Sequence, residues 1–138
     1  MLTQICTNEK QSNRLLKIGL DPKTATMHYE LGEYPGKLGK PLKFKVLEFG
    51  PDSRKSMRPV RITVPCWDFH SLVGILPIIH SKQLAVYPAI DLHMRSIRYL
   101  WLDDRSEYLS FGRTDDLFEN IIDCIEWLIN DNHIHANG

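Results

Sequence analysis

The clearest pattern of apolar and polar positions in this chain lies between residues 114 and 132. Apolar side chains recur there three and four residues apart, and acidic side chains fill the positions between them. This spacing predicts an amphipathic helix with one buried face. The apolar positions are Leu117, Phe118, Ile121, Ile122, Ile125, Leu128 and Ile129. Such a helix needs an apolar surface to cover, so we expect the preceding residues to form a sheet.

Two further helices are indicated by the residues at their ends. Thr7 is placed to cap a helix that runs to residue 20, and Gly19 suits the left-handed conformation with which many helices end. Asp68 is placed to cap another helix, which Pro77 stops. Residues 21–26 suit a short helical turn, because aspartate followed by proline favours the start of one.

Alternating apolar and polar residues predict short strands along the rest of the chain. Glycine, proline and polar residues gather at 32–41 and 50–59, which predicts two long loops. The strands are expected at residues 27–31, 42–49, 60–64, 84–87, 97–102 and 107–111. Because they come in adjacent groups, the pattern predicts an α+β fold with a mainly antiparallel sheet and about three helices packed on one face.

The length of 138 residues predicts a single domain, 1–138, with a basic loop and strand region at 33–61 and a flexible tail at 133–138. The formal net charge is zero, but twelve basic and six acidic side chains lie in residues 1–65, against five basic and eleven acidic in residues 66–138. Either the two halves pack together and neutralise each other, or the basic half offers a surface to a partner.

The sequence favours a cytoplasmic protein that does not bind membranes. Its N-terminus lacks the basic start and apolar run of a signal peptide, and no stretch approaches eighteen apolar residues. The three cysteines, Cys6, Cys66 and Cys124, are an odd number, which argues against a secreted disulfide scaffold.

Three segments carry a resemblance to a known family: QSNRLLKIGLDPKTATM at 11–27, PCWDFHSLVGILP at 65–77 and CIEWLINDNHI at 124–134. They resemble, in order, blocks of a family of small uncharacterised proteins of gut bacteria, often encoded near mobile elements or prophages. Thr26, Asp68 and Asn132 stand where that family usually has Asp, Ser and Gly, and its pattern has no counterpart of the basic region. The resemblance implies a mobile-element context but no activity, cofactor or catalytic residue.

The basic region offers the main candidate binding residues. Cations interleaved with aromatic side chains can bind single-stranded nucleic acid through phosphate contacts and stacking. Lys43, Lys45, Arg58 and Arg61 are the candidates for this role. A solvated strand face and an acidic protein partner are the alternatives, because Phe44 alternates with the lysines and is expected to point away from them.

The strand at 97–102 offers a second candidate surface. Tyr99 and Trp101 share one of its faces with Ile97, and Arg98 lies on the other. If the aromatic face looks outward, it forms an apolar patch suited to self-association or to a protein partner.

The remaining chemical candidates have structural interpretations. Cys66 and His70 are spaced to meet on a helix, where they could form a nucleophilic pair or half of a zinc site. His133 and His135 lie in the expected tail, and acidic residues from Asp103 to Asp116 suit a turn and a helix N-terminus.

No phosphate-binding, dinucleotide-binding, serine-hydrolase or zinc-protease motif occurs. The sequence therefore predicts a non-enzymatic cytosolic interaction protein without cofactor or metal, with a mobile-element accessory role as one interpretation. Its partner would be another protein or a second copy. A nucleic-acid-binding module that uses the region 37–61 is the alternative, and an enzyme based on Cys66 or His70 is a third.

Overall fold

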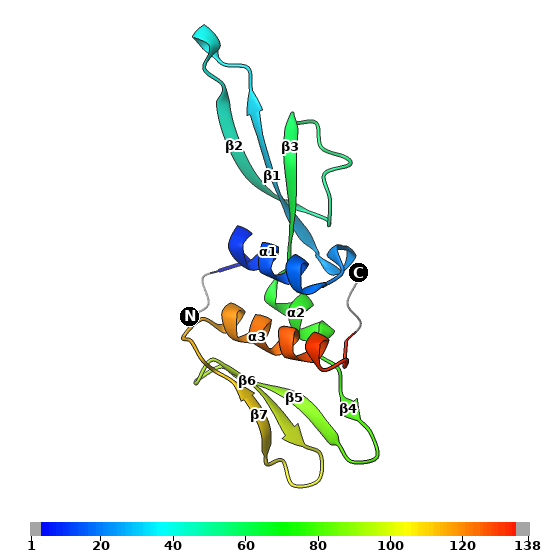
Figure 1. The fold of residues 1–138 in the computed structure, drawn as a ribbon. Coiled ribbons are helices and arrows are strands. Elements are labelled where there is room, and N and C mark those ends of the chain that lie inside the picture. The colour runs from blue at the N-terminus through cyan, green and yellow to red at the C-terminus, as the bar shows by residue number, and fades with distance from the viewer. Residues whose placement is uncertain (1–3, 135–138) are drawn as a thin grey trace. The chain divides into compact units, whose positions relative to one another are not determined.

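The computed structural model describes residues 4–134 of the chain, which divide after Ser71 into two compact units (Figure 1). The described helices are α1 (Glu9–Ile18), η1 (Pro22–Thr24), η2 (Lys37–Gly39), α2 (Phe69–Ile75) and α3 (Leu117–Asn130). The described strands are β1 (Met27–Tyr34), β2 (Leu42–Phe49), β3 (Val60–Cys66), β4 (Ile79–His80), β5 (Ala85–Asp91), β6 (Ser96–Trp101) and β7 (Glu107–Phe111). The predicted α+β class is confirmed, with the strands divided between two antiparallel sheets.

The first unit contains a three-stranded sheet with β1 at its centre. β1 pairs antiparallel with β2 over its whole length and with β3 on its other side. It runs three residues beyond the predicted strand, through Gly32 to Tyr34. A side chain at Gly32 would meet the Pro59 carbonyl oxygen at 2.2 Å and the Phe44 ring at 2.7 Å, so only glycine fits there. The glycine thus permits a close approach within the strand and does not end it.

Proline also lies inside a strand of this unit. The sequence predicts that Pro65 closes the third strand, but β3 continues to Cys66 and Pro65 pairs with His28 of β1. Because β3 pairs with β1 alone, it is an edge strand, and an edge strand tolerates the missing N–H of proline.

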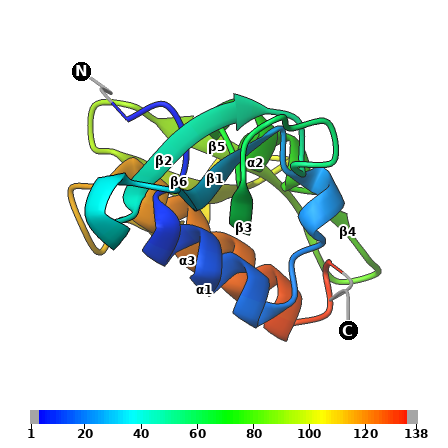
Figure 2. The same cartoon turned by 90° about the horizontal axis from the view of Figure 1, so that it is seen from above.

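Helix α1 packs against β3, and Figure 2 shows it running beside the sheet. Its N-cap is Asn8, not the predicted Thr7: the Asn8 side chain accepts a hydrogen bond from Gln11 N, and Gln11 bonds back to Asn8 N. Gly19 ends the helix in the left-handed conformation, as predicted, with φ 104°. Thr7 is buried, and its Oγ1 accepts a hydrogen bond from Trp67 N at 3.1 Å.

The second unit is a four-stranded sheet in the order β4-β5-β6-β7, with α3 packed on β6 and β7. The predicted amphipathic helix is confirmed. Asp116 caps it by accepting a hydrogen bond from Phe118 N, and Asn132 follows it in the left-handed conformation, with φ 61°. The apolar positions of the helix are buried, as the pattern requires: Leu117, Phe118, Ile121, Ile122, Ile125, Leu128 and Ile129.

The predicted tail at 133–138 is described only at its start. The His133 ring lies 5.1 Å from the Trp127 ring, and its Nε2 is 2.9 Å from Asp131. Residues 135–138, including His135, lie outside the described part of the chain. The division into two compact units does not test the single domain expected from the length, which therefore stays a prediction.

A buried amide connects α3 to the loops around it. Asn120 is completely buried, and its Nδ2 donates to the carbonyl oxygens of Arg95 at 2.6 Å and Thr114 at 2.8 Å. Its Oδ1 accepts from the backbone N–H and the hydroxyl of Thr114, both at 3.1 Å. The buried amide therefore has all of its hydrogen-bonding groups satisfied by the segments that contain Arg95 and Thr114.

We expect Asn120→Ala to lower the free energy of unfolding by about 3 kcal/mol, because it removes the hydrogen bonds of a fully buried amide to the partly buried groups of Arg95 and Thr114. Asn130→Ala is the matched control: Asn130 is exposed at the last residue of the same helix, and its replacement should change stability by no more than about 0.5 kcal/mol. Urea unfolding followed by circular dichroism measures both. Equal effects of the two substitutions would contradict the role assigned to Asn120.

Candidate functional site

The two faces of β1 carry different chemistry. Successive side chains of a strand point to opposite faces, so Tyr29, Leu31 and Glu33 share one face of the sheet, while His28 and Glu30 share the other. The first face contains the candidate binding surface, and the second contains a buried polar network.

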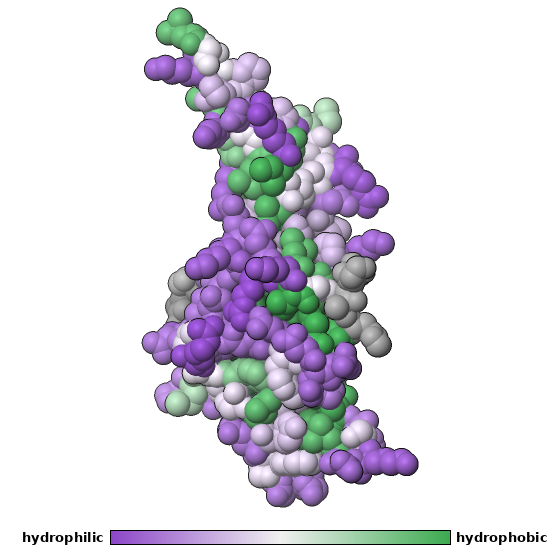
Figure 3. All heavy atoms as spheres, in the orientation of Figure 1, coloured by the Kyte–Doolittle hydropathy of each residue, from purple (hydrophilic) through white to green (hydrophobic). Residues whose placement is uncertain are grey.

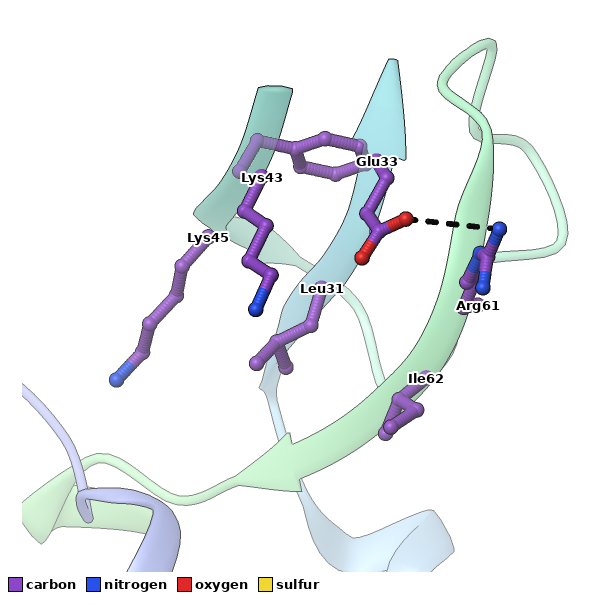
Figure 4. Close-up of a pocket in the computed structure, with 8 residues that line it drawn as sticks. Leu31, Glu33, Lys43, Lys45, Arg61 and Ile62 are labelled. Atoms are coloured by element: carbon purple, nitrogen blue, oxygen red, sulfur yellow. Dashed lines mark ion pairs between the residues drawn. The ribbon is translucent and has the colours of Figure 1, made fainter. Parts of the chain in front are cut away.

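A shallow hollow of about 370 Å³ lies on the first face, and we call it the basic hollow. The apolar side chains of Leu31 and Ile62 line it, and the Ile62 side chain is 59% exposed. Figure 4 shows Lys43, Lys45 and Arg61 placed around these two residues. The remaining lining residues are Gly32, Glu33 and Phe44. The sheet register explains the grouping, because Leu31 pairs with Lys45 on one side and with Ile62 on the other.

The three cations of the basic hollow differ in how they are held. Lys45 Nζ lies 2.6 Å from the carboxylate of Glu9 and 4.7 Å from the centre of the Tyr29 ring. Arg61 lies 3.6 Å from the carboxylate of Glu33, and both of these ion pairs are open to solvent, where such pairs contribute little to stability. Within residues 4–134, Lys43 has no carboxylate partner. Three cations against one lining carboxylate leave the hollow with a positive charge.

The fourth predicted cation, Arg58, is not part of this surface. Its guanidinium lies 3.2 Å from Glu30 and 3.0 Å from Glu48, on the opposite face of the sheet. The structure therefore brings together Lys43, Lys45 and Arg61 but separates Arg58 from them. The sequence did not reveal this division, because Arg58 precedes β3 and its direction depends on the path of the loop before that strand.

Phe44 alternates with the lysines along β2, so its side chain leaves the strand on the other side, although Phe44 also contributes to the lining of the basic hollow. Its ring reaches over Gly32, and its centroid lies 5.1 Å from that of Tyr34. The Phe44 ring therefore packs on the Tyr34 ring, at the border of the hollow that the cations line.

Glu30 is the centre of the buried network on the second face. Its side chain is almost fully buried and accepts hydrogen bonds from the Ser56 hydroxyl at 2.6 Å and from Arg58 at 3.2 Å. Its other oxygen lies 2.7 Å from His28 Nε2. The hydrogen bonds from Ser56, then His28 and Arg58, hold the pKa of Glu30 below its usual range. The network fastens the loop between β2 and β3 to the sheet.

Serine, histidine and glutamate also occur in hydrolytic triads, but their order here is different. His28 Nδ1 lies 2.8 Å from the carbonyl oxygen of Gly50, which only accepts, so Nδ1 carries a proton. Its Nε2 faces Glu30, and the Ser56 hydroxyl also bonds Glu30. No ring nitrogen is left to take a proton from Ser56, which a serine nucleophile requires.

Sequence reasoning missed this network. His28 and Glu30 are two residues apart on a predicted strand, which places both on one face, and that spacing was the available signal. Their partners Ser56 and Arg58 lie 26 and 28 residues beyond Glu30, in a loop whose path the sequence pattern does not define.

The structure buries part of the aromatic surface that the sequence predicts on the strand at 97–102. Tyr99 is 0% exposed, its ring lies 5.8 Å from that of Trp127 on α3, and its hydroxyl donates to the Pro77 carbonyl. Trp101 is half-buried and contacts the Tyr108 ring edge-on at 5.3 Å. Tyr99 is thus buried beside Trp127 of α3 and is not available to a partner, whereas Trp101 stays partly exposed.

Cys66 and His70 are not brought together as a reactive pair. Cys66 ends β3 and is fully buried, whereas His70 lies on α2 and is exposed. Asp104 and Asp116 cap a turn and a helix, as predicted. Among residues 4–134, no group of three or more histidine, cysteine or acidic side chains is arranged to hold a metal ion.

Comparison with protein-family models, with curated proteins and with solved structures found no match to this chain. None of the helices in the described residues is both long enough and apolar enough to cross a bilayer.

The lowered pKa of Glu30 predicts how stability depends on pH. The ionised carboxylate stabilises the folded chain above the ordinary pKa of a glutamate, and this contribution is lost as the pH falls through the lower pKa of the folded state. We expect Glu30→Gln to unfold at lower urea concentration at neutral pH. Its urea midpoint should also fall less than that of the wild type as the pH is lowered to about 3.

Glu48→Gln is the control for this measurement, because Glu48 is partly exposed and contacts Arg58 outside the buried part of the network. It should give a smaller change at neutral pH. A pH profile of Glu30→Gln that runs parallel to that of the wild type would contradict the stabilising role of the Glu30 carboxylate.

Proposed function

We propose that this chain is a non-enzymatic binding protein whose basic hollow docks an extended, acidic and partly apolar segment of a partner protein. The observation that carries the proposal is the apolar floor of half-buried Leu31 and exposed Ile62, set among three cations. Apolar contact supplies affinity, and the cations select a partner of opposite charge.

Exposed apolar side chains on the hairpin that carries the hollow support a docking role. Figure 3 shows hydrophobic residues gathered over the strands of the first unit, beside hydrophilic ones. On the same hairpin, Leu38 between β1 and β2 is 98% exposed, and Leu42 at the start of β2 is also exposed. Apolar groups gathered on a surface and bordered by charged side chains are typical of interaction sites.

The free edge of β2 favours an extended partner. Among the described strands, β2 pairs with β1 alone, so backbone N–H and C=O groups along its outer side are open to a further strand. An extended peptide can add to such an edge through backbone hydrogen bonds, while alternate side chains reach the neighbouring face. Lys43 and Lys45 are on β2 and would meet acidic side chains of that peptide.

The alternative of nucleic-acid binding has weaker support. It requires cations and aromatic rings on one surface, so that phosphates and bases are bound together. The Phe44 ring is packed on the Tyr34 ring, and Arg58 is held by Glu30 and Glu48. The remaining aromatic ring near the cations, Tyr29, is covered by Lys45.

The hydrogen bonding of the buried network supports the non-enzymatic part of the proposal. His28 bonds Glu30 and Gly50, and Ser56 bonds Glu30, so these polar groups are engaged with one another. By its resemblance to the family of gut-bacterial proteins, we further propose a cytoplasmic role as an accessory factor of a mobile element.

Selection of displayed random peptides on the whole chain tests this function. We expect enrichment of peptides in which Asp or Glu alternates with apolar residues. Lys43→Glu should weaken the binding of a selected peptide, measured by fluorescence anisotropy, by about tenfold or more, because a charge pair becomes a repulsion. Lys82→Glu is the matched control, since it makes the same charge change on an exposed residue of the second unit and should leave affinity unchanged.

Equal loss of affinity in Lys43→Glu and Lys82→Glu would contradict docking at the basic hollow, and so would enrichment of no acidic peptide. Binding of a mixed-sequence single-stranded oligonucleotide that weakens steeply with salt and is lost in Lys43→Glu would favour the nucleic-acid alternative.

A further inference from the structure

Two of the three cysteines lie in one small cluster of the first unit. Cys6 and Cys66 are buried together with Met27, and Tyr29 and Leu47 pack against them. The backbone of Cys6 pairs antiparallel with that of Asp68, and Cys66 is two residues before Asp68. Residues two apart along an extended chain point to the same side, which directs the Cys66 thiol toward Cys6. Both cysteines are free thiols.

Hydrogen bonds give the two thiols different chemical character. The sulfur of Cys6 lies 3.5 Å from the Tyr29 hydroxyl, and Cys6 and Cys66 belong to the same buried cluster. Hydrogen bonding from Cys66, and then from Tyr29, lowers the pKa of the Cys6 thiol, and the same contact with Cys6 raises the pKa of Cys66. The thiolate is the nucleophilic form of cysteine. Cys6 is therefore the thiol that reacts first, with a protonated thiol at its side.

We propose that Cys6 and Cys66 form a redox-active dithiol, which hydrogen peroxide oxidises to an intramolecular disulfide. The Cys6 thiolate attacks one peroxide oxygen, the O–O bond breaks, and Cys6 becomes a sulfenic acid as hydroxide leaves. The sulfur of Cys66 then attacks the sulfur of Cys6, its proton passes to the departing oxygen, and water is released. In total, two thiols and one peroxide give one disulfide and two waters, so the thiols lose two electrons and the peroxide gains them.

Access to the two sulfurs fits this order of events. Cys6 keeps 3% of its surface exposed, while Cys66 has none. Cys6 is thus slightly less enclosed than Cys66, which agrees with its role as the first thiol to react. This modification site is independent of the proposed docking function, although Tyr29 contacts both Cys6 and Lys45.

Cys124 provides an internal control in the same chain. It is fully buried on α3, and burial raises the pKa of its thiol, which disfavours the reactive thiolate. It belongs to the second unit, and neither of the other two cysteines does. We expect Cys124 to stay reduced under conditions that oxidise the pair.

Peptide mapping of the whole folded chain tests the proposal without any substitution. Trypsin places Cys6, Cys66 and Cys124 on three different peptides, residues 1–10, 62–82 and 114–138. After treatment with one equivalent of hydrogen peroxide and alkylation of free thiols, we expect a disulfide joining the first two peptides. The third peptide should carry the alkyl group, and reduction should restore three free thiols.

Two variants separate the steps of the reaction. Cys66→Ser should stop at a sulfenic acid on Cys6, which dimedone traps, whereas Cys124→Ser should form the disulfide as the wild type does. Three alkylated cysteines in the oxidised wild type would overturn the proposal. A disulfide that involves Cys124, or one that joins two chains, would also overturn it, whether or not the variants fold.

Discussion

The alternation of side chains along β1 is the constraint on which the first unit depends. β1 is paired on both sides, so its register is set by two neighbours at once, and a shift of one residue would exchange its two faces. Glu30 would then leave its buried partners, and Leu31 would leave Lys45 and Ile62. The basic hollow, the buried network and the contact between Tyr29 and Cys6 all follow from this single register.

The buried network makes that register specific. An ionised carboxylate inside a protein is costly unless hydrogen bonds and opposite charges surround it. Ser56, Arg58 and His28 supply these only when Glu30 faces them, so the wrong register would leave a charge unpaired. The same contacts hold the loop before β3, and that strand supplies Ile62 and Arg61 to the opposite face. A polar network on one face of the sheet thus positions the candidate binding surface on the other.

Local signals predicted most of the secondary structure, and tertiary contacts explain where they failed. The ends of α1 and α3 at Gly19 and Asn132 were readable because a left-handed residue is a local property. Gly32 and Pro65 were misread as the ends of strands. Gly32 is needed for the approach of Pro59 and Phe44, and Pro65 is tolerated because β3 is an edge strand. Both reasons lie in residues distant along the chain.

The sequence by itself determined the α+β class, the amphipathic helix at the carboxyl end and the alternation that places Lys43 and Lys45 on one face of a strand. These depend on periodicity, which is a property of residues close together along the chain. Only the tertiary structure decided that Arg61 joins those lysines while Arg58 turns away, that Tyr99 is buried, and that Cys6 meets Cys66. Strand pairing and loop paths bring such residues together, and both depend on contacts between segments that the local pattern does not specify.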